Sequence, residues 1–163
     1  MEKEIYTQEI EISKEDTIRS FKNLQPSLHF SVDELLYYPY LFFEHSFARK
    51  NPLSPLKGII GSTVDGISGV AALADKAPTF QIKTVSAERL LPSTIQKHRA
   101  VQIAEDYIFR TLSTKIKVLL TPKVTLQKQL LFYRPYWIVD AKQIGKDDFR
   151  LMVDGVSGKY HPL

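Results

Sequence analysis

The sequence of 163 residues contains no cysteine, which excludes disulfide bonds, thiolate metal sites and a cysteine nucleophile. No apolar run reaches the roughly 18 residues that a membrane-spanning helix needs. Seven glycines and nine prolines are too few for a collagen-like or low-complexity chain. The start, MEKEIYTQEIEI, is polar and alternating, unlike a signal peptide. We therefore expect a cytoplasmic protein, or an extracytoplasmic one if a signal or anchor has been removed.

What the sequence does contain is typical of a globular domain. It is 44% apolar and 25% charged, with a net charge of +4. Residues 1–80 carry 8 Lys and Arg against 11 Asp and Glu, whereas residues 81–163 carry 14 against 7. A basic second half can bind an acidic partner, but its basic residues form no block of five or six. Nucleic-acid binding by this half is therefore only a further functional alternative.

The first half begins with a pattern that predicts a strand and a short helix. Residues 4–12 alternate, which predicts a half-buried strand with Tyr6, Ile10 and Ile12 on one face. Ser13 stands where it can cap a helix, and Pro26 ends that helix. Residues 28–48 then predict a long strand, in which Pro39 implies an edge, a bulge or a bend.

The second half repeats this order. Residues 80–85 predict a strand, and a helical region follows over about 87–113, where Ser93 and Gln96 match a capping box. The expected core stripe of this helix consists of Val101, Ala104, Ile108 and Leu112. Residues 123–144 predict a second long strand that contains a proline, as the first one does.

Two motifs occur in the same order in both halves. LLYYPYLFFE (35–44) aligns with LLFYRPYWIVD (130–140) if Arg134 is an insertion, and VDGISG (64–69) matches VDGVSG (153–158) at five of six positions. We therefore predict an α+β fold of two β-α-β-β repeats, with mainly antiparallel sheet and a pseudo-two-fold duplication. The half-units span 1–75 and 79–163 and share one compact body, because either alone is too small to bury much core.

The second repeat resembles a PepSY-type module. The resemblance rests on the helical segment RAVQIAEDYIF (99–109), the strand YWIVDAKQI that follows it, and the closing turn VDGVSGK (153–159). The first half resembles the family less. The resemblance implies a non-catalytic module, often extracytoplasmic and associated with peptidases or with binding.

The shared turns are the best candidates for a structural role. Asp and Gly suit hairpin turns, because Asp can hydrogen-bond its own backbone and Gly tolerates positive φ. We expect this role for six residues, Asp65, Gly66, Gly69, Asp154, Gly155 and Gly158. The four histidines, His29, His45, His98 and His161, show no metal-binding spacing. We therefore predict no catalytic residue, no metal and no cofactor.

The aromatic strings are the most unusual feature of the sequence. Five rings, Tyr38, Tyr40, Tyr133, Tyr136 and Trp137, are candidates for a partner surface between the repeats, although aromatic residues mostly serve packing. We favour a non-enzymatic binding or assembly module with a protein or peptide partner, or with self-association. The alternative is a small hydrolase-like enzyme with a carboxylate or histidine site at the repeat interface.

Overall fold

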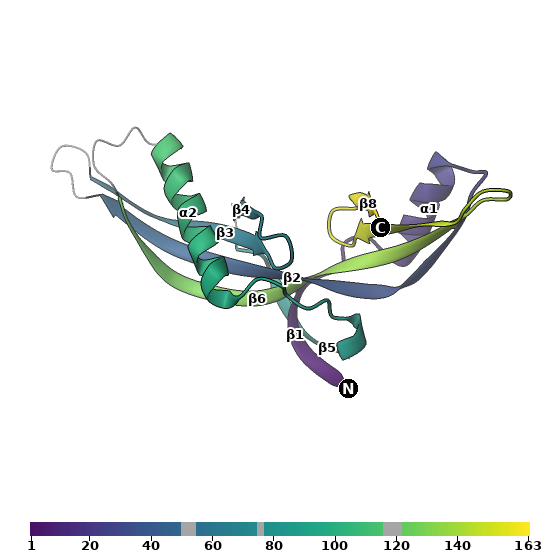
Figure 1. The fold of residues 1–163 in the computed structure, drawn as a ribbon, viewed down its shortest axis with the longest axis horizontal. Helices are drawn as coiled ribbons and strands as arrows, with labels where there is room; N and C mark the ends of the chain where they lie inside the picture. The colour runs from purple at the N-terminus through teal and green to yellow at the C-terminus, as the bar shows by residue number, and fades with distance from the viewer. Residues whose placement is uncertain (50–54, 75–76, 116–121) are drawn as a thin grey trace. The chain divides into compact units, whose positions relative to one another are not determined.

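The computed structural model describes residues 1–49, 55–74, 77–115 and 122–163. These residues form a mixed α+β fold with a mostly antiparallel sheet (Figure 1). The elements follow the order β1 (Glu2–Gln8), α1 (Lys14–Leu24), β2 (His29–Arg49), β3 (Leu56–Asp65), β4 (Ala71–Ala74), β5 (Phe80–Ser86), a 3-10 turn (Ala87–Arg89), α2 (Lys97–Lys115), β6 (Lys123–Lys142), β7 (Phe149–Asp154) and β8 (Tyr160–Pro162).

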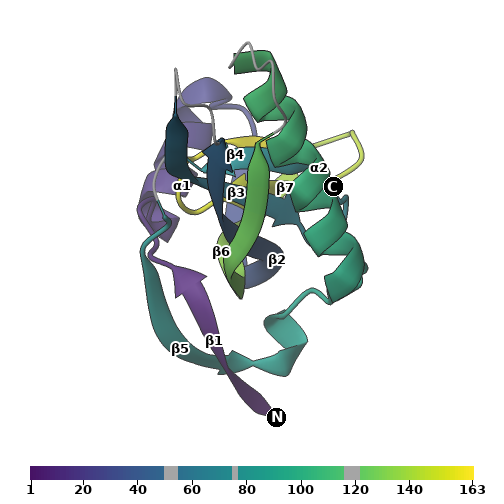
Figure 2. The ribbon, with the colours of Figure 1, turned by 90° about the vertical axis from the view of Figure 1, so that its left-hand side faces the viewer.

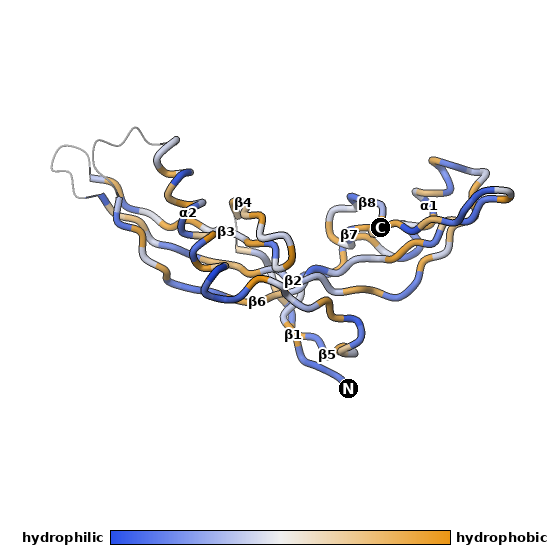
Figure 3. Tube along the Cα trace, in the orientation of Figure 1, coloured by the Kyte–Doolittle hydropathy of each residue, from blue (hydrophilic) through white to orange (hydrophobic). Residues whose placement is uncertain are grey.

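The strands are joined in the order β4-β3-β2-β6-β1-β5, and β7 pairs with both β6 and β8. The hairpins β3–β4 and β7–β8 are antiparallel, as is the pair β1–β5. Strand β1 meets β6 in parallel at Thr7 and Tyr133. The two long strands, β2 and β6, are therefore central, and the prolines within them do not mark a sheet edge. Apolar and polar stretches occur along both (Figure 3).

The chain divides into two compact units. Unit 1 comprises residues 1–38, 79–91 and 133–163, and unit 2 comprises residues 39–78 and 92–132. These units differ from the sequence halves 1–75 and 79–163, because each draws segments from both halves. Strands β2 and β6 each belong to both units.

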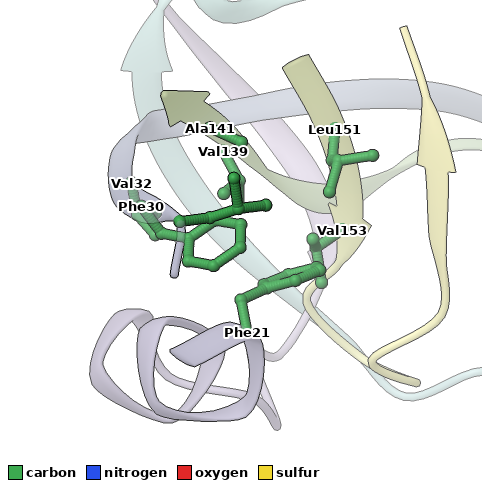
Figure 4. Close-up of a cluster of buried hydrophobic side chains, with 8 residues drawn as sticks. Phe21, Phe30, Val32, Val139, Ala141, Leu151 and Val153 are labelled. Atoms are coloured by element: carbon green, nitrogen blue, oxygen red, sulfur yellow. The ribbon is translucent and has the colours of Figure 1, made fainter. Parts of the chain in front are cut away.

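Helix α1 and strands β2, β6 and β7 provide the core of unit 1 (Figure 4). Ser13 caps α1 as predicted, since its hydroxyl oxygen accepts a hydrogen bond from the Asp16 amide at 3.1 Å. Phe21 extends from α1 toward the sheet and lies 5.3 Å from the Phe30 ring. Its other neighbours in this core are Leu28, Val32, Val139, Ala141, Leu151 and Val153.

Helix α2 covers the strands of unit 2, and Figure 2 views it from this side. The predicted stripe is largely confirmed, because Ala104 and Ile108 are fully buried and Leu112 is nearly so. The predicted capping box is wrong. Helix α2 begins at Lys97, and the Ser93 hydroxyl instead donates to the Gly66 carbonyl oxygen at 2.8 Å. A contact with a distant turn therefore replaces the expected local cap.

The first strand is also shorter than predicted, and the face that carries Tyr6 is the exposed one. Strand β1 ends at Gln8, and Tyr6 is 44% exposed. Ile5 on the opposite face is buried and packs with Tyr37 and Val85. The alternation was read correctly, but the inward face is the one that reaches this small cluster.

Candidate functional site

The two Asp-Gly turns have the same internal hydrogen bonds. The Asp65 carboxylate accepts from the amides of Ile67 and Ser68 at 2.8 and 2.9 Å. In the second turn, Asp154 Oδ1 accepts from the amides of Val156 and Ser157 at 2.8 and 3.3 Å. Gly69 and Gly158 close the turns at φ of 75° and 78°, a conformation that favours glycine. These are the geometries of Asx-type turns.

Each turn is also docked in the same way within its own unit. The Gly66 amide donates to the Pro39 carbonyl, and the Gly155 amide donates to the Pro135 carbonyl. The Gly66 carbonyl in turn accepts from the Thr94 and Ile95 amides, just before α2. The Gly155 carbonyl likewise accepts from two amides just before α1, those of Glu11 and Ile12. Each turn therefore ties a proline-bearing strand to the start of a helix.

The two turns differ in their surroundings. Asp154 is buried, its Oδ2 accepts from the Ser157 hydroxyl at 2.9 Å, and it lies 2.8 Å from Arg134 Nε. Asp65 is only half-buried. The second turn therefore pairs a buried carboxylate with a half-buried Arg134.

None of the five candidate aromatic side chains is exposed. Tyr136 retains 6% of its exposure, and its ring lies 5.7 Å from that of Tyr38 in unit 1. Tyr40 stacks on Phe132 in unit 2 at 5.7 Å. The Trp137 indole donates to the Ile12 carbonyl oxygen at 2.8 Å. These contacts favour the packing interpretation that the sequence left open.

Tyr133 is the remaining candidate. It is half-buried in the cluster of Ile5, Tyr37 and Val85, and its carbonyl oxygen accepts from the Thr7 hydroxyl at 3.0 Å. Burial raises the pKa of the Tyr133 phenol above its ordinary value of 10.0. The phenol therefore stays protonated at neutral pH.

Two buried polar side chains in unit 2 have no hydrogen-bond partner among the described residues. Both imidazole nitrogens of His45 and the hydroxyl of Ser62 are in this state, and both residues are fully buried. Ser62 pairs with Phe43 across β2 and β3, so Ser62 and His45 share a sheet face. Burial lowers the pKa of His45 below 6.5, and the Glu105 carboxylate offsets part of this effect. Burial therefore favours the neutral form of this imidazole.

A hollow lined by charged side chains lies in unit 1 and measures about 620 Å³. Its lining includes Asp140, Lys142, Asp148 and Arg150, all from the second half of the sequence. Arg150 Nε donates to Asp140 Oδ1 at 2.7 Å, which neutralises this carboxylate. The described residues contain no group of three His, Asp or Glu that could hold a metal ion.

An exposed apolar pair lies on the β1–β5 ribbon of unit 1. Tyr6 and Ile82 are directly opposite each other across the antiparallel pair and are 44% and 61% exposed. The opposite face of the ribbon carries Ile5 and Val85, which are buried. The sequence does not reveal this surface, because alternation does not say which face is buried and local patterns cannot pair residues 2–8 with residues 80–86.

Comparison of the chain with family models, curated proteins and solved structures gives no significant match. None of the described helices is long and apolar enough to cross a membrane.

Proposed function

We propose that this chain is a non-enzymatic binding and assembly module that recruits a protein partner by strand addition along β5. The observation that carries the proposal is the exposed pair Tyr6 and Ile82 on a strand that ends the strand order. Four successive residues of β5, 81–84, are exposed. An edge strand offers backbone donors and acceptors to an added strand, and the exposed apolar pair gives that strand something to pack against.

A second copy of the chain is the partner that suits this edge best. In an antiparallel pairing centred on Ile82, the two Ile82 side chains lie opposite each other, and Lys83 faces Gln81 of the other copy. The exposed pairs then form one apolar row across the joined sheets. A pairing centred on Lys83 would instead place two ammonium groups face to face, which is unfavourable.

Sedimentation velocity tests this proposal. One added strand pair buries less than the roughly 1,200 Å² of a standard interface, so we expect weak, concentration-dependent dimers as the protein approaches about 1 mM. Ile82→Lys should abolish the dimer. Ile144→Lys is the matched control, because Ile144 is fully exposed in a turn of the same unit. This variant should dimerise as the native chain does. A monomer at every concentration, or equal dimerisation of both variants, contradicts the proposal.

We also infer that the chain contains two copies of the predicted β-α-β-β segment, 1–75 and 79–163, each extended by one short strand, β4 or β8. The copies have exchanged parts, in that each compact unit contains segments of both. Support comes from the repeated element order, β1-α1-β2-β3-β4 followed by β5-α2-β6-β7-β8. The shared turn contacts align Pro39 with Pro135 and Ile12 with Ile95. Tyr133 then aligns with Tyr37 rather than Tyr38, so this alignment needs no insertion at Arg134.

The exchange is tested by cutting the chain between residues 78 and 79. Each compact unit contains segments from both fragments, so neither fragment alone can complete a unit. We expect each fragment alone to lack the circular dichroism and dispersed NMR spectrum of the intact chain, and mixing them to restore both. Two fragments that fold independently as monomers would contradict the exchange.

The resemblance to PepSY-type modules remains part of the proposal. The order α2-β6-β7 with the turn at residues 153–159 supports it and agrees with a non-catalytic role. Nucleic-acid binding is the competing proposal, because unit 2 carries 11 Lys and Arg against 5 Asp and Glu. A gel shift with nucleic acid at low salt separates this proposal from the protein-binding module. Retention that weakens as salt is added would support nucleic-acid binding, because phosphate binding is strongly salt-dependent.

A further inference from the structure

The second surface of interest is an apolar groove in unit 1, separate from the β5 edge. It measures about 280 Å³. Three of its lining side chains are strongly exposed, Leu24 at 66%, Tyr160 at 53% and Phe149 at 43%. Its inner lining comes from the buried core residues Phe21, Leu28, Phe30 and Leu151. The groove therefore opens directly onto the core of the unit.

The corresponding surface of unit 2 shows what can cover such a groove. Both helices start from the same anchor, since Ile12 before α1 packs on Gly158 and Ile95 before α2 packs on Gly69. Helix α1 has 11 residues and α2 has 19. Helix α2 thus continues about 12 Å further, at 1.5 Å per residue.

Two of the additional residues of α2 are buried within unit 2. Ile108 is fully buried, Leu112 is 4% exposed, and α2 packs against β3 and β4. In unit 1, strands β7 and β8 form the matching hairpin, and it is there that Phe149 and Tyr160 are exposed. Leu24 is the last residue of α1, so the groove begins where the shorter helix ends.

We propose that this groove binds an amphipathic helix of about two turns from a protein partner, in the place that residues 108–115 take in unit 2. The buried face of the partner helix carries bulky aliphatic side chains four residues apart, as Ile108 and Leu112 are in α2. The volume is below the range of about 300–1,000 Å³ for small-molecule sites and suits inserted side chains. A second copy cannot supply this helix from its own α2, because the aliphatic face of α2 is already buried, so we assign the helix to a different protein.

The test uses a peptide of residues 104–115, AEDYIFRTLSTK, with a hydrocarbon link between positions 106 and 110. Both positions are exposed, and the link is needed because so short a helix is unstable in water. The fluorescent peptide is titrated with the full chain. We expect saturable binding, which Ile108→Glu or Leu112→Glu in the peptide abolishes.

Two variants of the protein locate the binding. Leu24→Glu and Phe149→Glu should each weaken binding at least tenfold, while Ile144→Glu should change it less than twofold. All three residues are exposed, so folding can be verified by circular dichroism. A photo-crosslinker at position 112 should label residues within 21–30 or 149–160.

Several results would overturn the proposal. These are no saturable binding up to about 1 mM peptide, equal binding by the groove variants and the control, or crosslinks confined to other surfaces. Ile82→Lys lies on the β5 edge and should leave peptide binding unchanged. Loss of dimerisation with intact peptide binding, or the reverse, therefore distinguishes failure of this inference from failure of the proposed strand addition.

Discussion

Replacing Gly66 by alanine tests whether the docked turn organises unit 2. A Cβ at this position would lie 2.8 Å from the Pro39 carbonyl oxygen and 3.1 Å from Pro39 Cβ. Real Cβ atoms essentially never approach closer than 3.0 Å, and a backbone oxygen cannot turn aside as a side chain can. The turn must therefore move away from the strand that it contacts.

The cost follows from the hydrogen bonds that this movement breaks. The Gly66 amide donates to Pro39 at 2.9 Å, and the Gly66 carbonyl accepts from Thr94 and Ile95 at 2.8 and 3.2 Å. The Ser93 hydroxyl adds a fourth bond at 2.8 Å. At about 1 kcal/mol net for each bond, loss of two to four predicts destabilisation by about 2–4 kcal/mol.

Gly145→Ala is the control for this substitution. Gly145 has a φ of 79°, so alanine is strained there, but no atom lies within 4 Å of the added Cβ. We expect this variant to lose about 1 kcal/mol. The free energy of unfolding is measured by urea denaturation, and amide exchange at residues 93–100 reports the local effect. A Gly66→Ala loss below that of Gly145→Ala would refute the reasoning.

Three further predictions concern single side chains. Asp154→Ala should cost about 2–4 kcal/mol, because it removes the hydrogen bonds within the turn and leaves Arg134 without its carboxylate; urea denaturation measures the loss. Trp137→Phe should cost about 1–2 kcal/mol in the same assay, since it removes the bond to the Ile12 carbonyl. Burial lowers the pKa of His45 in the folded state. The contribution of His45 to the free energy of unfolding is therefore fully present above pH 6.5, where the imidazole is neutral in both states, and it is lost as the pH falls through the lowered folded-state pKa. Unfolding measured from pH 8 to pH 5 should therefore show a smaller decline in His45→Phe than in the native chain.

Local chemistry accounts for what the sequence predicted correctly. The Ser13 cap, the Asp65 and Asp154 turns and the apolar stripe of α2 each depend on residues within a few positions of one another. The proline in each long strand was also recognised. Such features are readable because the groups that stabilise them are neighbours in the chain.

The errors come from contacts between distant residues. Ser93 matched a capping box, but its hydroxyl contacts Gly66, 27 residues away. Alternation over residues 4–12 defines two faces without saying which one finds a core, and the face that carries Tyr6 is the exposed one. The pairing of β1 with β5 decides this, and it joins residues about 80 positions apart. The division of each long strand between two compact units likewise depends on contacts between residues that are far apart in the sequence.

The composition of the groove floor makes helix binding more favourable in unit 1 than in unit 2. Under the proposed alignment, His45 and Ser62 of unit 2 correspond to Ala141 and Leu151 of unit 1. The first pair is buried beneath α2 without hydrogen-bond partners among the described residues, and burial of such groups is costly. A covalently attached helix can tolerate that cost, because it loses no translational freedom when it packs. A separate partner helix has no such advantage, and in unit 1 it would meet an apolar floor. Of the two unit 1 counterparts, Leu151 lines the groove and Ala141 belongs to the same core cluster, so neither places a buried polar group beneath a bound helix.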